Sequence, residues 1–329
     1  MSFDKKDPQN DQLVRSGVTR QAFLKGVALT ALLPFLPHIS NAHAAAIGVT
    51  EIAPGVFVHQ GKYADVSPEN GGDISNCSFI VGKEAVAVID TGGSARIGTS
   101  VRDAVSAVTP NPILYVINTH MHPDHVFGNA AFSGDNPNYI AHHKMAHGLS
   151  QRAEGYLKRN QDWMGEVLFE GTKIVMPTKS VDDVLEIDLG GRLLRLQARP
   201  TAHTDNDMTV HDTLTDTLIL GDIAFSGRIP TIDGSIVGWL KLIKSLKGEA
   251  QARVIPGHGP PSMSMTDALV PLERYLTVVA TDVRAAIKAG KTISDATETA
   301  GLSEKDAWLL FSEHHKRNVT AAFAELEWE

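Results

Sequence analysis

One short stretch, rich in potential metal ligands, constrains the possible fold and function of this chain more than any other. Residues 118–125 read NTHMHPDH, and four of these eight residues can bind a metal ion: His120, His122, Asp124 and His125. His120 and His122 are two residues apart, so in an extended backbone both side chains point the same way. Imidazole and carboxylate groups are the usual ligands of a borderline metal such as zinc. The stretch therefore predicts a metal site.

The metal-binding stretch follows a segment that is typical of a buried strand. Residues 112–117 are apolar and rich in β-branched side chains. Similar runs at 56–58, 77–81 and 85–89 are separated by glycine-containing turns, and residues 94–108 predict a helix that ends before Pro110. A strand, a helix and a strand thus lead into the ligands, as in α/β units that keep their chemistry on loops at strand ends.

The rest of the chain predicts more strands and then helices alone. Strands are expected at 138–141, 174–176, 184–189, 193–197, 208–211, 217–220 and 252–255, and helices at 144–169 and 234–247. Gly190-Gly191 predicts a hairpin turn, and Gly221-Asp222 is expected to end the strand at 217–220. After Met263 only helices are expected, at 266–289 and 303–326.

Three further potential ligands are predicted to lie next to strand ends. These are His203, Asp222 and His258, and each has glycine or another small residue beside it that lets loops approach closely. Together with the first stretch they make a set of five histidines and two aspartates.

In this order, the seven residues resemble the metallo-β-lactamase superfamily, as does Asp90-Thr91-Gly92 at the end of an earlier strand. The resemblance covers residues 50–262. It implies an α+β fold, namely an αββα four-layer sandwich with the site at the edge between two sheets. The domain organisation expected is a signal at 1–44, a catalytic domain at 45–262, and a helical C-terminal extension at 263–329 packed on the same domain.

The resemblance also implies a role for each ligand. His120, His122 and His203 would hold one metal ion, Asp124, His125 and His258 a second, and Asp222 would bridge the two. Two such ions lie about 3.5–4 Å apart and lower the pKa of a bound water to about 7, which supplies a metal-bound hydroxide. Asp124 is expected to orient that water and is the candidate catalytic residue. The cofactor expected is Zn²⁺, two per chain, although iron or manganese also suit such ligands.

Asp222 and the segments around the ligands narrow the resemblance. Many β-lactamases of the family carry cysteine or serine in this region, whereas thioesterases of the glyoxalase II type carry a bridging aspartate, so Asp222 argues against antibiotic hydrolysis. Residues 118–132 and 203–207 resemble an exported branch, the SoxH-like and quinoprotein relay system metallohydrolases. The activity expected is hydrolysis of a thioester, ester or related bond. The alternatives are a mononuclear iron dioxygenase acting on sulfur compounds, a lactam hydrolase, and a non-catalytic periplasmic component of an oxidation system.

The first 44 residues predict an export signal. A polar, basic segment at 1–25 precedes an apolar run at 26–39 and the small-x-small pattern Ala42-His43-Ala44. Residues 19–25 resemble the twin-arginine motif, with Gln21 in place of the second arginine. A periplasmic protein is therefore expected. An uncleaved anchor is the alternative, although the apolar run is short beside the roughly 20 residues of a membrane-spanning helix.

Charge and the remaining residue types say less about function. The net charge of −8 disfavours binding to nucleic acid, so the expected partner is a small-molecule substrate. Cys77 is the sole cysteine and is expected to be buried. Residues 314–318 form a small basic patch that could hold an anion, with a solvated helix face as the simpler interpretation. The tryptophans are expected to pack in the core, with Trp239 near the mouth of the site. Oligomeric state is left open.

Overall fold

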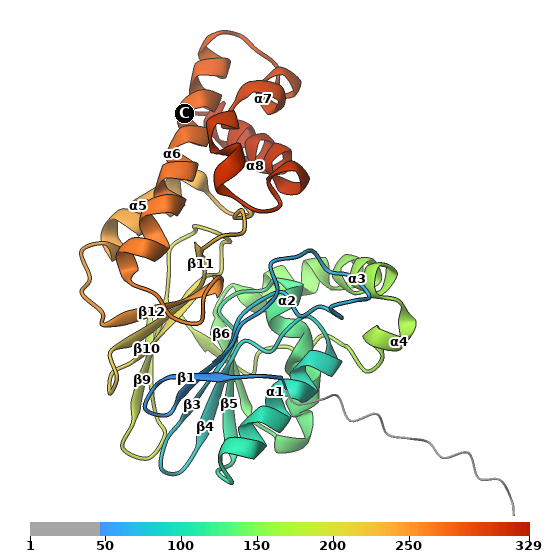
Figure 1. The fold of residues 1–329 in the computed structure, drawn as a ribbon, viewed down its shortest axis with the longest axis vertical. Helices are drawn as coiled ribbons and strands as arrows, with labels where there is room; N and C mark the ends of the chain where they lie inside the picture. Colours follow the sequence, from blue (N-terminus) through green and yellow to red (C-terminus); the bar gives the residue numbers. More distant parts are fainter. Residues whose placement is uncertain (1–46) are drawn as a thin grey trace, which may run out of the picture. The chain divides into compact units, whose positions relative to one another are not determined.

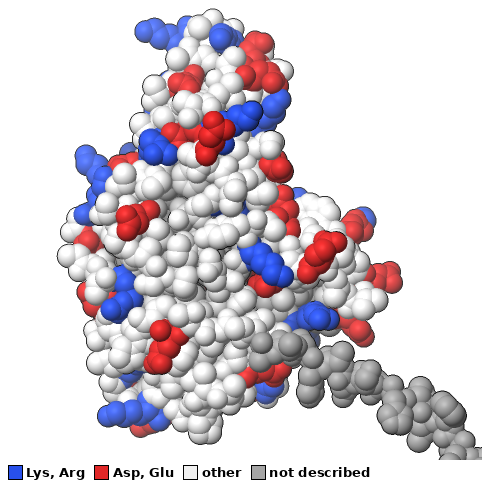
Figure 2. Space-filling view, in the orientation of Figure 1, with Lys and Arg blue, Asp and Glu red and all other residues white. Residues whose placement is uncertain are grey.

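The computed structural model of the chain describes residues 47–329. The predicted export signal lies outside the described residues. No helix within residues 47–329 combines the length and the apolar character needed to cross a membrane. Figure 2 shows acidic and basic side chains interspersed over the face of the molecule in view.

The first half of the described chain forms a seven-stranded sheet whose strands follow one another in sequence order. Pairing is antiparallel from β1 to β4 and parallel from β4 to β7. The strands are β1 (Thr50–Ala53), β2 (Val56–His59), β3 (Cys77–Val81), β4 (Val86–Ile89), β5 (Ile113–Ile117), β6 (Asn138–His142) and β7 (Lys179–Val181).

The second half forms a five-stranded sheet in the order β12-β11-β10-β9-β8, in which only β11 and β12 are parallel. Its strands are β8 (Val184–Asp188), β9 (Leu193–Ala198), β10 (Met208–Asp212), β11 (Thr217–Phe225) and β12 (Arg253–His258). Gly190 and Gly191 join β8 to β9 with φ angles of 90° and 75°. Glycine adopts such angles without strain, which is why this turn was legible in the sequence.

The two sheets face each other across an apolar core, and helices cover their outer faces (Figure 1). Ile80 and Ile117 from one sheet meet Leu194 and Val210 from the other. Helix α1 (Ala95–Val108) and the 3₁₀-helix η1 (Phe127–Asp135) pack on the first sheet, whereas α5 (Ile236–Leu246) and α6 (Met265–Lys288) pack on the second. The arrangement confirms the predicted α+β fold.

Three α-helices follow β5 in the part of the chain where the predicted ligands begin. They are α2 (Pro123–Val126), α3 (Met145–Met164) and α4 (Glu166–Phe169). Gly165, with φ at 83°, separates α3 from α4 within the expected helix at 144–169. Met121 and Met145 are both buried in the small apolar cluster that holds these helices together.

The C-terminal region is helical, as predicted, but its division differs from the prediction. It contains α6, α7 (Ile293–Thr299), the 3₁₀-helix η2 (Leu302–Ala307) and α8 (Phe311–Leu326). Helix α7 was not predicted and begins at a capping box formed by Thr292 and Asp295. The single helix expected at 303–326 was wrong, because Leu309 leaves the helix to pair with the loop after β11. Its N–H donates to the carbonyl of Gly227 at 2.8 Å, and its carbonyl accepts from Ile229 N–H at 3.0 Å.

Two strand predictions were also wrong. Residues 174–176 form no strand, because Ile174 and Val175 pack against apolar clusters while Pro177 restricts the backbone that follows. β11 does not end at Gly221-Asp222 but continues to Phe225. The glycine instead marks an irregularity within the strand, where the register with β12 shifts on either side of Gly221.

Candidate metal centre

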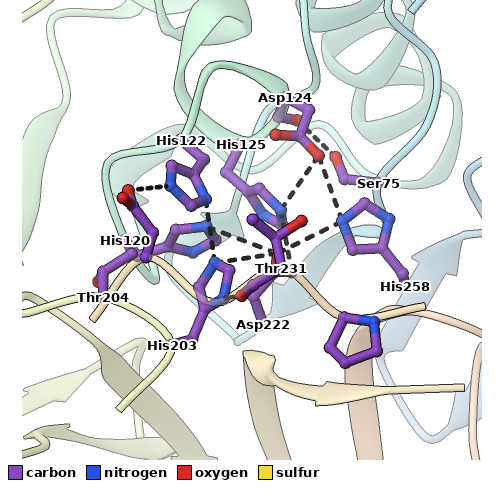
Figure 3. Close-up of polar contacts among 12 residues, drawn as sticks. Ser75, His120, His122, Asp124, His125, His203, Thr204, Asp222, Thr231 and His258 are labelled. Atoms are coloured by element: carbon purple, nitrogen blue, oxygen red, sulfur yellow. Dashed lines mark hydrogen bonds and ion pairs between the residues drawn. The ribbon is translucent and has the colours of Figure 1, made fainter. Parts of the chain in front are cut away.

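The structure brings all seven predicted ligands together at one edge of the two sheets (Figure 3). They form two groups, and within each group the candidate ligand atoms lie within 4.8 Å of one another. The first group contains His120, His122, His203 and Asp222, and the second contains Asp124, His125 and His258.

Asp90, at the end of β4, fixes the stretch that begins the site. Its φ of 57° places the residue in the left-handed region, which aspartate tolerates better than most residues. The Asp90 carboxylate accepts hydrogen bonds from Thr119 N–H at 2.9 Å and from Thr119 Oγ1 at 2.7 Å. It also accepts from Nδ1 of His125 at 2.8 Å. One buried carboxylate thus sets both the path of the chain into the site and the orientation of a ligand.

Asp222 lies at the centre of the seven residues, where it contacts both groups. Its Oδ2 lies 3.3 Å from Nε2 of His203 and 3.4 Å from Nε2 of His258, and its Oδ1 lies 3.1 Å from Nε2 of His125. This position requires a neighbour without a side chain, because a Cβ on Gly257 would lie 1.9 Å from Asp222 Oδ1. β11 and β12 can therefore pair beside the Asp222 carboxylate only because position 257 is glycine.

The ring nitrogen of each histidine that points away from the cluster donates a hydrogen bond to the surrounding protein. Nδ1 of His258 donates to the carbonyl of Ile74 at 2.7 Å, and Nδ1 of His120 contacts Thr119 Oγ1 at 3.1 Å. His125 donates to Asp90, as described. Such partners fix the tautomer and the ring orientation of metal-binding histidines.

The loop at residues 230–233 supplies the corresponding partners for the other two histidines. The carbonyl of Thr231 accepts a hydrogen bond from Nδ1 of His203 at 2.7 Å. The carboxylate of Asp233 accepts from Nε2 of His122 at 2.9 Å and pairs with Arg152 of α3. Nδ1 of His122 is left facing Nε2 of His203 at 2.9 Å, so these two nitrogens are the ones available to a shared ion.

Histidine neighbours keep the two central carboxyl groups ionised. Burial alone would raise the pKa of Asp222, but neighbouring histidines, His258 first, outweigh burial and hold the pKa well below its usual value. Burial would likewise raise the pKa of Asp124, yet His125 and His258 lower it. Both carboxylates at the centre of the cluster are therefore ionised, which is the form that binds a cation.

Two of the histidines are neutral at pH 7. Burial lowers the pKa of His203 to about 3, and burial together with His125 holds the pKa of His120 well below its usual value. Neutral imidazole is the form that binds metal ions.

Three of the seven residues have buried atoms without hydrogen-bond partners, as expected where a metal ion binds. Among the described residues, the buried side-chain atoms lacking a partner include Nε2 of His120, Nε2 of His125 and Oδ1 of Asp222. A buried polar atom without a partner costs about 1–3 kcal/mol, so such atoms rarely occur without a ligand or water to satisfy them. All three point into the cluster, where an ion would contact them.

A cavity of about 650 Å³ opens onto the cluster. His122, Asp124, Asp222 and His258 line its floor. The wall from α3 carries Arg152, Tyr156, Arg159 and Trp163, and the opposite wall carries Asp65, Arg228, His314 and Arg317.

Several residues in and near the cavity lie in positions that the sequence did not predict. Trp163 was expected to pack in the core but is 52% exposed and lines the cavity, whereas Trp239, expected near the mouth, is fully buried against His203 with ring centroids 5.3 Å apart. Asp233 and Arg228 were not predicted at all. Asp233 lies in a turn with no motif around it, and its partner His122 is 111 residues away.

The basic patch at 314–318 divides between two faces of α8. His314 and Arg317 line the cavity, and Lys316 pairs with Glu298 away from it. His315 and Asn318 are buried. Lys316 therefore fits the simpler interpretation of a solvated helix face, whereas the other residues of the patch do not. Cys77 is buried, as predicted.

Comparison with known families gives one match, to the model of the Metallo-beta-lactamase superfamily over residues 70–258. That range contains all seven candidate ligands. No curated protein matches the chain by sequence.

Solved structures share the fold at low sequence identity. A metallo-beta-lactamase from Pontibacter korlensis is 17% identical with a TM-score of 0.58, and the match covers 70% of this chain and 99% of that one. One from Erythrobacter litoralis is 19% identical with a TM-score of 0.54, covering 70% of this chain and 96% of that one. A double mutant of the sec-alkyl sulfatase PisA1 is 17% identical with a TM-score of 0.64, covering 85% of this chain and 50% of that one.

Proposed function

Because the chain belongs to the metallo-beta-lactamase superfamily, we propose that it is an exported hydrolase that uses two zinc ions to cleave a thioester, ester or related bond in a small molecule. Family membership and the two groups of histidine and aspartate residues support a metal-dependent hydrolase as the general class. The number and identity of the ions, the bond cleaved and the export are the parts that we propose.

One observation carries the proposal of two ions. The candidate ligands fall into two groups, and Asp222 contacts histidines of both, with Oδ2 near His203 and Oδ1 near His125. Oδ2 also lies 3.4 Å from Nε2 of His258, so the carboxylate contacts both groups and is suited to bridge two cations. His120, His122 and His203 would hold the first ion, and Asp124, His125 and His258 the second.

When bound, a pair of divalent ions activates water for attack and stabilises the charge that develops on the substrate. The chain's own residues orient the reacting groups. Asp124 lines the cavity with its carboxylate ionised, so it can accept a hydrogen bond from water and orient it. Asp90 and Asp233 hold the rings of His125 and His122 in position. No serine or cysteine nucleophile is required.

The charge of the cavity supports an anionic substrate. Its described lining includes four arginines, at positions 152, 159, 228 and 317. Apart from Asp124 and Asp222, the sole lining carboxylate is Asp65, which pairs with His314 at 2.7 Å and contacts Arg228 at 3.4 Å. Arg228 is 7% exposed, and its Nε has no partner among the described residues. Arginine is well suited to bind a carboxylate, sulfonate or sulfate group.

The test combines metal analysis with a substrate panel on the same sample. We expect two zinc ions per chain and hydrolysis of at least one thioester, carboxyl ester or sulfate ester, with lactams turned over poorly. The sulfate ester is included because the sec-alkyl sulfatase shares the fold. One iron per chain with oxygen consumption would instead support the dioxygenase. Two zinc ions without turnover of any substrate would support the non-catalytic component.

A variant pair separates catalysis from folding. Asp124→Asn should lower kcat by about 100-fold or more, since it removes the ionised carboxylate that orients water at the cavity floor. Asp135→Asn is the control, because Asp135 pairs with Arg102 away from the cavity. Full activity in Asp124→Asn would contradict the proposed role.

Export through the twin-arginine route is tested by cell fractionation. Arg20→Lys should leave the protein in the cytoplasm, and Lys5→Arg should not. Equal periplasmic amounts of both would contradict this route. Assignment to the SoxH-like and quinoprotein relay branch is part of the same proposal, and it rests on the motif contexts at 118–132 and 203–207.

A further inference from the structure

We propose that Asn318, in the C-terminal helix α8, is a positioning residue for the first metal group. It acts through the loop at 230–233, which orients His203 and His122. The inference rests on the proposed metal site but not on the substrate or the reaction. Through Asn318, the C-terminal extension helps to orient the ligands of the metal centre.

Asn318 is fully buried and uses its whole side-chain amide to hold this loop. Its Oδ1 accepts a hydrogen bond from Ile232 N–H at 3.0 Å. Its Nδ2 donates to the carbonyl of Pro230 at 2.7 Å and to the hydroxyl of Tyr275 at 2.9 Å. The two backbone partners flank Thr231, so the amide fixes the peptide groups on both sides of the residue that contacts His203.

Thr231 and Asp233 pass this constraint on to the ligands. The Thr231 carbonyl lies 2.7 Å from Nδ1 of His203, and the Asp233 carboxylate lies 2.9 Å from Nε2 of His122. Asp233 N–H also donates to the carbonyl of His203 at 3.0 Å. A shift of the loop would therefore rotate both imidazoles of the first group together.

Helix α8 holds the continuation of the same segment with a second side chain. Glu325 lies seven residues after Asn318 and therefore on the same helix face. Its carboxylate accepts hydrogen bonds from Ile236 N–H at 2.7 Å and from Ser235 Oγ at 2.6 Å. Two residues of one helix face thus secure residues 230–236.

The second metal group does not depend on this loop. His125 is oriented by Asp90, and His258 donates to the carbonyl of Ile74. Among the described residues, neither Asp90 nor Ile74 is a hydrogen-bond partner of Asn318. Loss of Asn318 should therefore weaken the first group selectively, which general destabilisation of the fold would not do.

The experiment measures the two metal affinities separately by chelator competition with Zn²⁺, and records visible absorption spectra on stepwise addition of Co²⁺. In Asn318→Leu, which removes all three hydrogen bonds but keeps the branched shape of the side chain, we expect the affinity of one ion to fall about 10–100-fold, as on loss of an outer partner of a ligand. The other affinity should stay within about two-fold of the wild type. The Co²⁺ spectrum should change for one ion alone.

Two controls separate positioning from stability. Glu304→Gln weakens an ion pair with Arg274 and a bond to Trp308 within the same extension, away from the loop. It should lower Tm without changing either metal affinity. Tyr275→Phe removes the hydroxyl beside Nδ2 but leaves both loop bonds of Asn318, so it should behave like Glu304→Gln.

Asn318→Asp serves if the leucine variant does not fold. It keeps an acceptor for Ile232 but places a carboxylate oxygen against the carbonyl of Pro230, so the selective loss of one ion should persist. Unchanged affinities, or equal loss of both ions, in the folded variant would overturn the inference. Wild-type protein that binds no ion would overturn the metal site itself, whereas two ions without hydrolysis would overturn only the proposed reaction.

Discussion

The carboxylate of Asp90 accepts a hydrogen bond from Nδ1 of His125 at 2.8 Å, so the aspartate at the end of β4 orients a ligand 35 residues later in the chain. The same carboxylate accepts two hydrogen bonds from Thr119, immediately before His120. The buried carboxylate of Asp90, which is not itself a candidate ligand, therefore holds both Thr119 and His125 in place.

Replacing Asp90 tests this arrangement. Asp90→Asn keeps a side chain that tolerates the left-handed backbone at φ 57° but removes the charge that polarises His125. We expect the affinity of the second ion and kcat/KM each to fall about 10–100-fold. Metal titration and steady-state kinetics measure the two effects. Wild-type affinity would show that the charge on Asp90 is dispensable.

Adding one methyl group beside the bridging aspartate should disrupt the centre. A Cβ on Gly257 would lie 1.9 Å from Asp222 Oδ1, so Gly257→Ala must displace the carboxylate or separate β11 from β12. We expect loss of at least one bound ion, measured by elemental analysis. Gly134→Ala is the control, because a Cβ there meets nothing within 4 Å. Two ions retained in Gly257→Ala would contradict the central position of Asp222.

The charge of the cavity wall should appear in the kinetics. Arg317→Gln removes a cation that lines the cavity, so KM for an anionic ester should rise about five- to ten-fold while that of a neutral ester with the same scissile bond stays unchanged. Lys316→Gln removes the same charge from the outward face of α8, where Lys316 pairs with Glu298. Equal effects of the two variants would indicate long-range charge and not a contact.

A histidine outside the site should make stability depend on pH. Burial, aided by His143, lowers the pKa of His142 to about 4, whereas an unfolded chain would titrate near 6.5. The unfolded state therefore binds more protons as the pH falls from 6.5 toward 4, and the contribution of His142 to stability, present above pH 6.5, is lost over that range.

The loss is of order 1–3 kcal/mol at pH 4, since one pKa unit corresponds to about 1.4 kcal/mol. Denaturant unfolding at several pH values measures it. His142→Asn can still accept the hydrogen bond from Lys144 N–H. It should lose less stability on acidification than the wild type, and identical pH profiles would exclude His142 as the source.

The sequence predicted best what depends on local spacing. Apolar runs and turns predicted most of the strands, whereas the αββα fold was implied by the resemblance to a known family. The seven residues now seen together were selected by residue type and by position near strand ends. Asp222 lies inside β11 and not after it, yet the glycine beside it was still a valid marker, because a register shift and a strand end both use glycine.

Features that depend on contacts between residues far apart in the chain could not be predicted from the sequence. Leu309 breaks a helix because its backbone pairs with Gly227 and Ile229, some 80 residues earlier, and nothing in residues 303–326 encodes that partner. Trp239 lies against His203 and not at the mouth, because α5 turns its buried face toward the second sheet. Long-range contacts of this kind override local propensity.

The ligands come from both sheets, since His120 to His125 follow β5 of the first and Asp222 and His258 belong to the second. Ions bound between the two sheets would link them and close a loop of the chain that runs from residue 120 to residue 258. Closing so long a segment restricts the unfolded chain, and binding only to the folded state adds stability in proportion to the logarithm of ion concentration. Chelation should therefore loosen the two halves of the molecule together, and amide hydrogen exchange should quicken on both sides of the sandwich.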